Sequence, residues 1–220
     1  MRNLIKGTFS GKYKTLLSAS LVIGGMCIFG MYIHEVSCWR FVSFMGLAIV
    51  ALAISMSARD IRSLLAVLGL VSFTRNVVWY SLAGMAFGML LGLVYNVVKA
   101  DSLLPPALTK FALIAPLIGV MEELVFRGFV QSRLAPAGAM ASVIVAAAGH
   151  TLYKYLVIKT VPVDLDTYMP SLVLLTFLVG VVFGTVKEAS GSVIPPALAH
   201  ALFDIIVYGG AILAPVWIWS

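Results

Sequence analysis

The chain has 220 residues, of which 61% are hydrophobic and only 11% are charged, and its mean hydropathy is +1.05. This composition excludes an ordinary soluble domain and is typical of an integral membrane protein. The net charge of +6 follows from Lys and Arg concentrated on one side of a membrane, so no nucleic-acid partner is expected.

The apolar runs predict an all-α protein. A hydrocarbon core of about 30 Å needs roughly 20 apolar helical residues. Residues 61–75 are too short to cross and amphipathic enough to lie at the interface. The expected fold is a polytopic transmembrane helical bundle of about seven spans plus this short interfacial helix. The spans are predicted at 16–34, 40–57, 77–98, 108–132, 140–159, 169–186 and 193–218.

The first span follows a basic segment that contains Arg2, Lys6, Lys12 and Lys14. The apolar run is too long for a signal peptide, so we interpret it as a retained anchor. The distribution of basic residues places the N-terminus inside. Residues 1–15 are therefore predicted to be a basic cytoplasmic N-terminus, and residues 16–220 a single transmembrane domain.

The third span carries small residues at a regular spacing, with Gly84, Gly88 and Gly92 recurring every fourth residue. Such a stripe lets two helices approach closely. It predicts tight packing inside the protein, with dimerisation as the alternative.

Ionisable side chains inside the spans are the main functional signal, because each is costly there unless it faces the protein interior or a wet cavity. At ~1.5 Å rise per residue, three of them lie ~16 to ~18 Å from the inner face and His200 lies ~12 Å from it. Any one of them can be satisfied by a neighbouring helix, but the set indicates one site built from three helices. The deep residues are Glu122, Glu123, Arg127, His150, His200 and Asp204.

Helical spacing suggests separate roles for these residues. Glu123 and Arg127 stand four residues apart with the acid first, the favourable order for an ion pair. They are predicted to be a structural pair, leaving Glu122, about 100° around the helix, as the free carboxylate. His200 and Asp204 are also four residues apart, so Asp204 can orient or polarise the imidazole.

This set of side chains suits hydrolysis. A carboxylate held out of water can act as a general base near neutral pH, and two imidazoles opposite it can polarise a carbonyl and stabilise an oxyanion. No serine or cysteine stands in an obvious nucleophile arrangement with His150 or His200. The sequence therefore predicts amide hydrolysis within the membrane, with water as the nucleophile.

The motifs resemble those of a known family. "EELVFR" (122–127) resembles the EExxxR motif of the CPBP family, the CAAX-protease and bacteriocin-processing (Abi) intramembrane proteases, and "HALFD" (200–204) is similar to its HxxxN or HxxxD motif. His150 occupies the place of the FxxxH motif, although Ala146 stands where the family usually has phenylalanine. The resemblance covers about residues 110–205, with a catalytic core expected at about 108–208.

The resemblance implies a glutamic-type intramembrane endopeptidase with a lipidated or membrane-embedded protein or peptide as substrate. It implies that Glu122 and His150 activate water, and that His200 and Asp204 stabilise the tetrahedral intermediate. Glu123 and Arg127 would support the site. The expected location is a prokaryotic cytoplasmic membrane, where the chain is an integral, multi-pass protein.

Two alternatives remain open. Glu122, His150 and His200 can also bind zinc with water as a fourth ligand, although no HExxH motif is present; we expect no cofactor, with zinc as the alternative. The same cluster can serve a non-catalytic immunity or transport protein, because buried ionisable groups also mark proton relays.

Overall fold

The computed structural model describes residues 2–70, 73–99, 102–161 and 169–212, with side chains from residue 13 onward. The described segments form helices and connecting turns, without strands. In chain order the elements are α1 (Arg2–Tyr32), α2 (Arg40–Ser55), α3 (Ile61–Val67), α4 (Arg75–Val98), α5 (Phe111–Glu123), the π-helical segment η1 (Leu124–Val130), α6 (Gln131–Leu134), the 3₁₀ turn η2 (Ala135–Ala137), α7 (Ala139–Lys159), α8 (Met169–Ser190) and α9 (Ile194–Tyr208).

The all-helical prediction is confirmed for the described residues, whereas the number of seven spans stays a prediction. Four helical segments are long and apolar enough to cross a membrane: 13–32, 75–98, 139–159 and 169–190. Helices α2 and α9 are apolar but shorter. The predicted fourth span is a continuous path in which α5, η1 and α6 follow one another.

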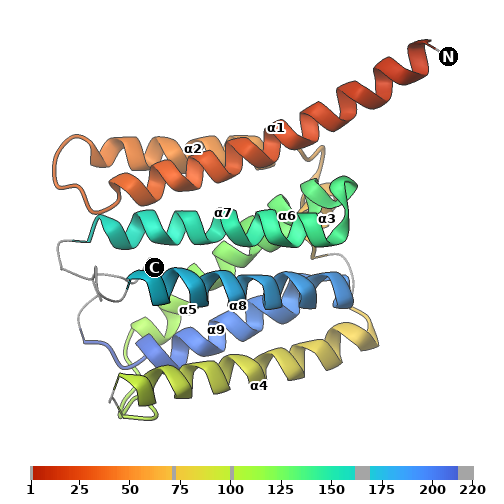
Figure 1. Cartoon of the computed structure of the whole chain (residues 1–220). Helices are drawn as coiled ribbons and strands as arrows, with labels where there is room; N and C mark the ends of the chain where they lie inside the picture. The colour runs from red at the N-terminus through yellow and green to blue at the C-terminus, as the bar shows by residue number, and fades with distance from the viewer. Residues whose placement is uncertain (1, 71–72, 100–101, 162–168, 213–220) are drawn as a thin grey trace.

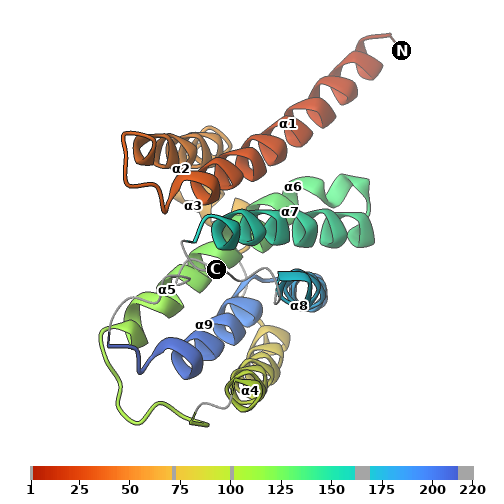
Figure 2. The ribbon, with the colours of Figure 1, turned by 60° about the vertical axis from the view of Figure 1, so that its left-hand side comes forward.

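The helices pack as a layered bundle. Helix α7 lies between the α1–α2 pair and α8, while α4 lies at the opposite edge beside α9 (Figure 1). Helix α5 runs obliquely through the bundle, packing on α9 and leading into η1, which contacts α7 (Figure 2). This arrangement brings α5, α7 and α9 together.

The outer surface of the bundle is apolar. Large hydrophobic side chains on α4 and α8, such as Leu82, Leu90, Leu174 and Leu178, are exposed. An apolar surface of this extent is unfavourable in water and suits a lipid environment. The chain is an integral membrane protein in its architecture as well as in its composition.

The glycine stripe of α4 packs against α9, which confirms the predicted role in packing within the protein. A Cβ atom added to Gly84 would lie 2.8 Å from the carbonyl oxygen of Pro195, and one added to Gly88 would collide with the Ala199 backbone. The absence of these Cβ atoms therefore sets the distance between α4 and α9. Because Ala199 immediately precedes His200, the stripe also positions a candidate site residue.

The helix predicted at 61–75 is shorter in the structure, since α3 ends at Val67. It begins with a capping box in which Asp60 accepts a hydrogen bond from the Ser63 amide at 2.7 Å. The backbone and side-chain hydrogen bonds of Ser63 hold the pKa of Asp60 below its ordinary value. Gly69, with a φ of 74°, then turns the chain so that its carbonyl accepts the amide of Val193 at 3.1 Å.

The last helix also ends earlier than expected. A helix to residue 218 was predicted, whereas α9 ends at Tyr208; residues 213–218 lie outside the described residues. Thr109 accounts for the early end, because its amide donates to the Gly209 carbonyl at 2.8 Å and its hydroxyl donates to the Ala211 carbonyl at 2.6 Å. A longer α9 would bond these backbone carbonyls within the helix. Here they accept hydrogen bonds from the segment that precedes α5 instead.

Candidate functional site

The polar site starts where α5 changes into the π-helical segment η1. Glu122 and Glu123 are the last two residues of α5, and Arg127 lies inside η1. All three side chains are buried. Single π-helical turns within α-helices occur frequently at functional sites, and here the turn follows the two glutamates directly.

The ion pair expected from the i, i+4 spacing is present. Arg127 Nη1 donates to Glu123 Oε1 at 2.9 Å, and both side chains are at most 1% exposed. Glu123 has a second role that the spacing did not predict, because its Oε1 also lies 3.0 Å from His200 Nδ1 on α9. Glu123 therefore connects η1 and α9.

Glu122 contacts residues on a different helix. Its Oε1 lies 2.7 Å from the Lys154 ammonium and accepts the Tyr153 hydroxyl at 3.1 Å. Its Oε2 lies 3.4 Å from His150 Nε2 and 4.0 Å from His200 Nε2. The prediction that Glu122 is a free carboxylate is therefore wrong, since it forms a buried ion pair with α7.

Tyr153 and Lys154 belong to the site, although the motif spacing did not predict them. Lys154 stands four residues after His150, on the same face of α7, and this spacing was the available signal. A lysine near the end of a span ordinarily extends to the interface, so the spacing alone did not assign it to the site. In the structure Lys154 is 6% exposed and points inward.

His150 is held by aromatic rings. Its ring centroid lies 4.9 Å from that of Phe126 and 6.3 Å from that of Tyr153. Ala146, which departs from the family's usual phenylalanine, is 1% exposed one turn earlier on α7. Phe126 of η1 thus supplies an aromatic contact to His150 from a neighbouring element.

His200 and Asp204 lie on one face of α9, as expected, but without a direct hydrogen bond. His200 Nε2 is 3.9 Å from Asp204 Oδ1, beyond hydrogen-bond distance. The residue that contacts the other ring nitrogen is Glu123, not Asp204. With its side chain 13% exposed, His200 is more accessible than Glu122, Glu123 or Asp204.

Gly119 gives the α9 side chains their space. A Cβ atom added to this glycine would collide with Asp204 Oδ2 and would lie 2.9 Å from His200 Cδ2. Gly119→Ala is therefore expected to displace both side chains and to reduce activity by roughly 100-fold, since small misplacements of reacting groups have effects of this size. Peptide cleavage by the purified variant checks this, with Gly24→Ala as the matched control because a Cβ atom there meets open space. An active Gly119→Ala variant would contradict the expected close packing.

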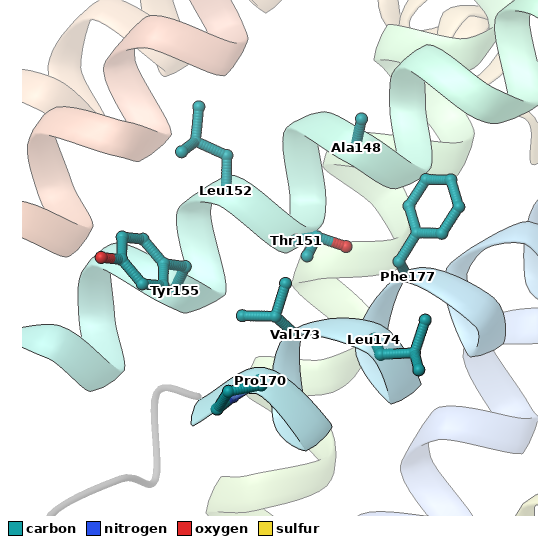
Figure 3. A pocket seen from close by; sticks show the side chains of 8 residues that line it. All are labelled: Ala148, Thr151, Leu152, Tyr155, Pro170, Val173, Leu174 and Phe177. Atoms are coloured by element: carbon teal, nitrogen blue, oxygen red, sulfur yellow. The ribbon is translucent and has the colours of Figure 1, made fainter. Parts of the chain in front are cut away.

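A separate open groove lies between α7 and α8 and has a volume of about 610 Å³. Figure 3 shows its lining, which is apolar except for the hydroxyls of Thr151 and Tyr155. Thr151 Oγ1 is buried and has no hydrogen-bond partner among the described residues. The groove provides an apolar surface along the helix that carries His150, but it contains none of the ionisable groups of the site.

In the part of the chain that the structure describes, no three His, Cys, Asp or Glu side chains are arranged to hold a metal ion. The arrangement instead consists of two buried ion pairs, Glu122 with Lys154 and Glu123 with Arg127. The two imidazoles lie beside them, with ring centroids 6.4 Å apart. Such a cluster can accept a proton, donate hydrogen bonds to a developing oxyanion and hold a substrate carbonyl.

Comparison with family models matches residues 105–206 to the model described as "Type II CAAX prenyl endopeptidase Rce1-like". Comparison with curated proteins and with solved structures found no match. The matched range contains every residue of the site, from Gly119 on α5 to Asp204 on α9. Residues 105–206 are therefore similar to the CAAX-protease (CPBP) family, the family that the three sequence motifs resemble.

Proposed function

We propose that the protein is an intramembrane endopeptidase that hydrolyses a peptide bond of a lipidated or membrane-embedded protein or peptide. The observation that carries the proposal is the convergence of Glu122, His150 and His200 in one cluster, in which Glu122 and His150 are buried and His200 is partly exposed. This cluster lies within the residues that match the type II CAAX prenyl endopeptidase model. The apolar groove beside α7 supports a substrate with a hydrocarbon or transmembrane portion.

In the proposed reaction, Glu122 takes a proton from water while the water oxygen attacks the scissile carbonyl carbon. His150, with its Nε2 3.4 Å from Glu122 Oε2, helps to orient the water. His200 Nε2 donates a hydrogen bond to the oxyanion of the tetrahedral intermediate. This nitrogen is available for that role because no described residue lies within hydrogen-bond distance of it. Glu122 then passes the proton to the leaving nitrogen as the C–N bond breaks, giving a carboxylic acid and an amine; the acid then loses its proton to the amine or to the solvent.

Asp204 contributes to the environment of His200 without a direct hydrogen bond. Its Oδ1 lies 3.9 Å from His200 Nε2, and Asp204 is 5% exposed. We assign it the role of supporting the oxyanion site through charge and packing. Glu123 and Arg127 support the same site from the other side, since Glu123 contacts His200 Nδ1.

We propose that the chemistry does not use a metal ion. A zinc ion held by Glu122, His150 and His200 would lie close to the Lys154 ammonium, which is 2.7 Å from Glu122 Oε1. Two cations competing for one buried carboxylate repel each other. The donor set therefore fits a divalent metal poorly and fits a protonated lysine well.

A cleavage assay with the purified protein in liposomes tests both the proposed function and the proposed metal-free chemistry. The substrates are a prenylated CaaX-type reporter peptide and the same peptide without the lipid. We expect cleavage of the prenylated peptide, with a rate that is unchanged after exhaustive chelation. No cleavage of either peptide would contradict the function, whereas activity that follows stoichiometric bound metal would contradict the metal-free chemistry.

A further inference from the structure

The two carboxylate oxygens of Glu122 have different surroundings. Oε1 accepts the Tyr153 hydroxyl at 3.1 Å and lies 2.7 Å from the Lys154 ammonium. Oε2 faces the two imidazoles, 3.4 Å from His150 Nε2 and 4.0 Å from His200 Nε2. From this asymmetry we propose that Lys154 and Tyr153 are positioning residues that hold Oε1, so that Oε2 is the oxygen that takes the proton from water.

The burial of Lys154 is the first observation that supports this proposal. A buried ammonium is costly unless it is paired with a carboxylate in good geometry. Lys154 lies five residues before the end of α7 at Lys159, about 7.5 Å along the helix axis, a distance that a lysine side chain can cover to reach the interface. It instead reaches Glu122 and is only 6% exposed.

Tyr153 makes the arrangement rigid. Its ring stacks on Phe126, with centroids 5.8 Å apart, and on Phe29, with centroids 6.3 Å apart. The side chain is 1% exposed, so the hydroxyl is directed at Glu122 by packing on two sides. Tyr153 and Lys154 are consecutive on α7, and their donors converge on one oxygen.

These contacts determine which carboxylate oxygen of Glu122 is able to react. A carboxylate oxygen has two lone pairs, and on Oε1 both have donors. Oε2 keeps a lone pair directed toward His150 and His200, where a water and a carbonyl must meet. This inference rests on the proposed function, because the reactive oxygen matters only if Glu122 acts as the general base.

Kinetics provide the first test. Lys154→Met keeps most of the side-chain volume and removes the donor, and it should lower kcat for the prenylated reporter peptide by roughly 100-fold with KM unchanged. Tyr153→Phe keeps the stacked ring and should lower kcat about tenfold.

Lys110→Met, at an exposed lysine that precedes α5, is the matched control and should behave as the wild type. Values of kcat within threefold of the wild type for both Lys154→Met and Tyr153→Phe would overturn the proposal, and Tyr153→Phe decides alone if Lys154→Met does not fold.

Thermal unfolding tests the pairing independently of activity. Lys154→Met should lower the melting temperature because it leaves the Glu122 charge buried without its cation. The double variant Glu122→Gln with Lys154→Met removes both charges, so it should regain most of that loss. A double variant that melts below Lys154→Met would overturn the pairing.

These measurements separate the inference from the proposed function. If the wild type cleaves no peptide, the function fails, while the thermal comparison still decides whether Lys154 pairs with Glu122. If the wild type cleaves and Glu122→Gln does not, the function holds; wild-type kcat in Lys154→Met and Tyr153→Phe then overturns the positioning role alone.

Discussion

Glu122→Gln is expected to abolish peptide cleavage while leaving the protein folded. The amide keeps the shape of the carboxylate. Its oxygen can still accept hydrogen bonds from Tyr153 and Lys154, which contact Glu122 Oε1 in the wild type. It cannot take a proton from water. General base catalysis contributes roughly 10²- to 10⁴-fold, so turnover of the reporter peptide should fall by about that factor. The protein should stay folded, but with a lower melting temperature, because the neutral amide leaves the buried Lys154 ammonium without its carboxylate.

The matched control is Glu188→Gln on α8. Glu188 pairs with Lys187 at 3.1 Å and its side chain is 32% exposed, outside the site. We expect this variant to cleave at the wild-type rate. Near-normal turnover in Glu122→Gln would exclude Glu122 as the general base. If wild-type cells are protected from a toxic peptide and Glu122→Gln protects them equally without cleaving it, the cluster serves a binding role instead.

Arg127→Ala is expected to have the largest effect on stability. Arg127 is 1% exposed, and its guanidinium is the cation paired with the fully buried Glu123. Removing one partner of a buried pair leaves an uncompensated charge and costs about 3–5 kcal/mol. Helix α8 packs closely over the guanidinium, since a Cβ atom added to Gly180 would lie 3.0 Å from Arg127 Nη2, so the truncation also leaves a void. We expect a lower yield and a lower melting temperature.

A double variant and a neighbouring arginine test the cause of this loss. Glu123→Gln combined with Arg127→Met removes both charges, and should be more stable than Arg127→Ala. Arg133→Ala on α6 removes a half-buried arginine that donates to the Ser57 carbonyl at 3.2 Å, and its effect should be much smaller. An Arg127→Ala variant that is stable but inactive would give Arg127 a direct role in the chemistry.

The position of the helices was largely determined by the sequence. Runs of about 20 apolar residues have few alternatives to a helix in a membrane, because backbone groups must be satisfied within the segment. The predicted span 77–98 therefore corresponds closely to α4 at Arg75–Val98. The Glu123–Arg127 pair was predictable for a related reason, since both members lie on one helical path and their distance depends on local geometry.

The ends of some helices depended on contacts with distant segments. The apolar run after Tyr208 predicts a longer last helix, but the carbonyls there are bound by Thr109, about 100 residues earlier in the chain. In the same way, the turn after α3 is held by Val193 and Ser192. Hydropathy contains no information about such partners.

By itself, the sequence predicted that Glu122, His150, His200 and Asp204 lie near one layer of the bundle, because the rise of a helix is constant. Only the tertiary structure decided which groups touch. Rotation of α7 and α9 about their axes, set by packing against α1, α4 and α8, directs Lys154 to Glu122 and His200 to Glu123. Side-chain direction across helices depends on that rotation and on close contacts such as Gly88 against Ala199, so spacing along the chain could place the site but could not assign its pairs.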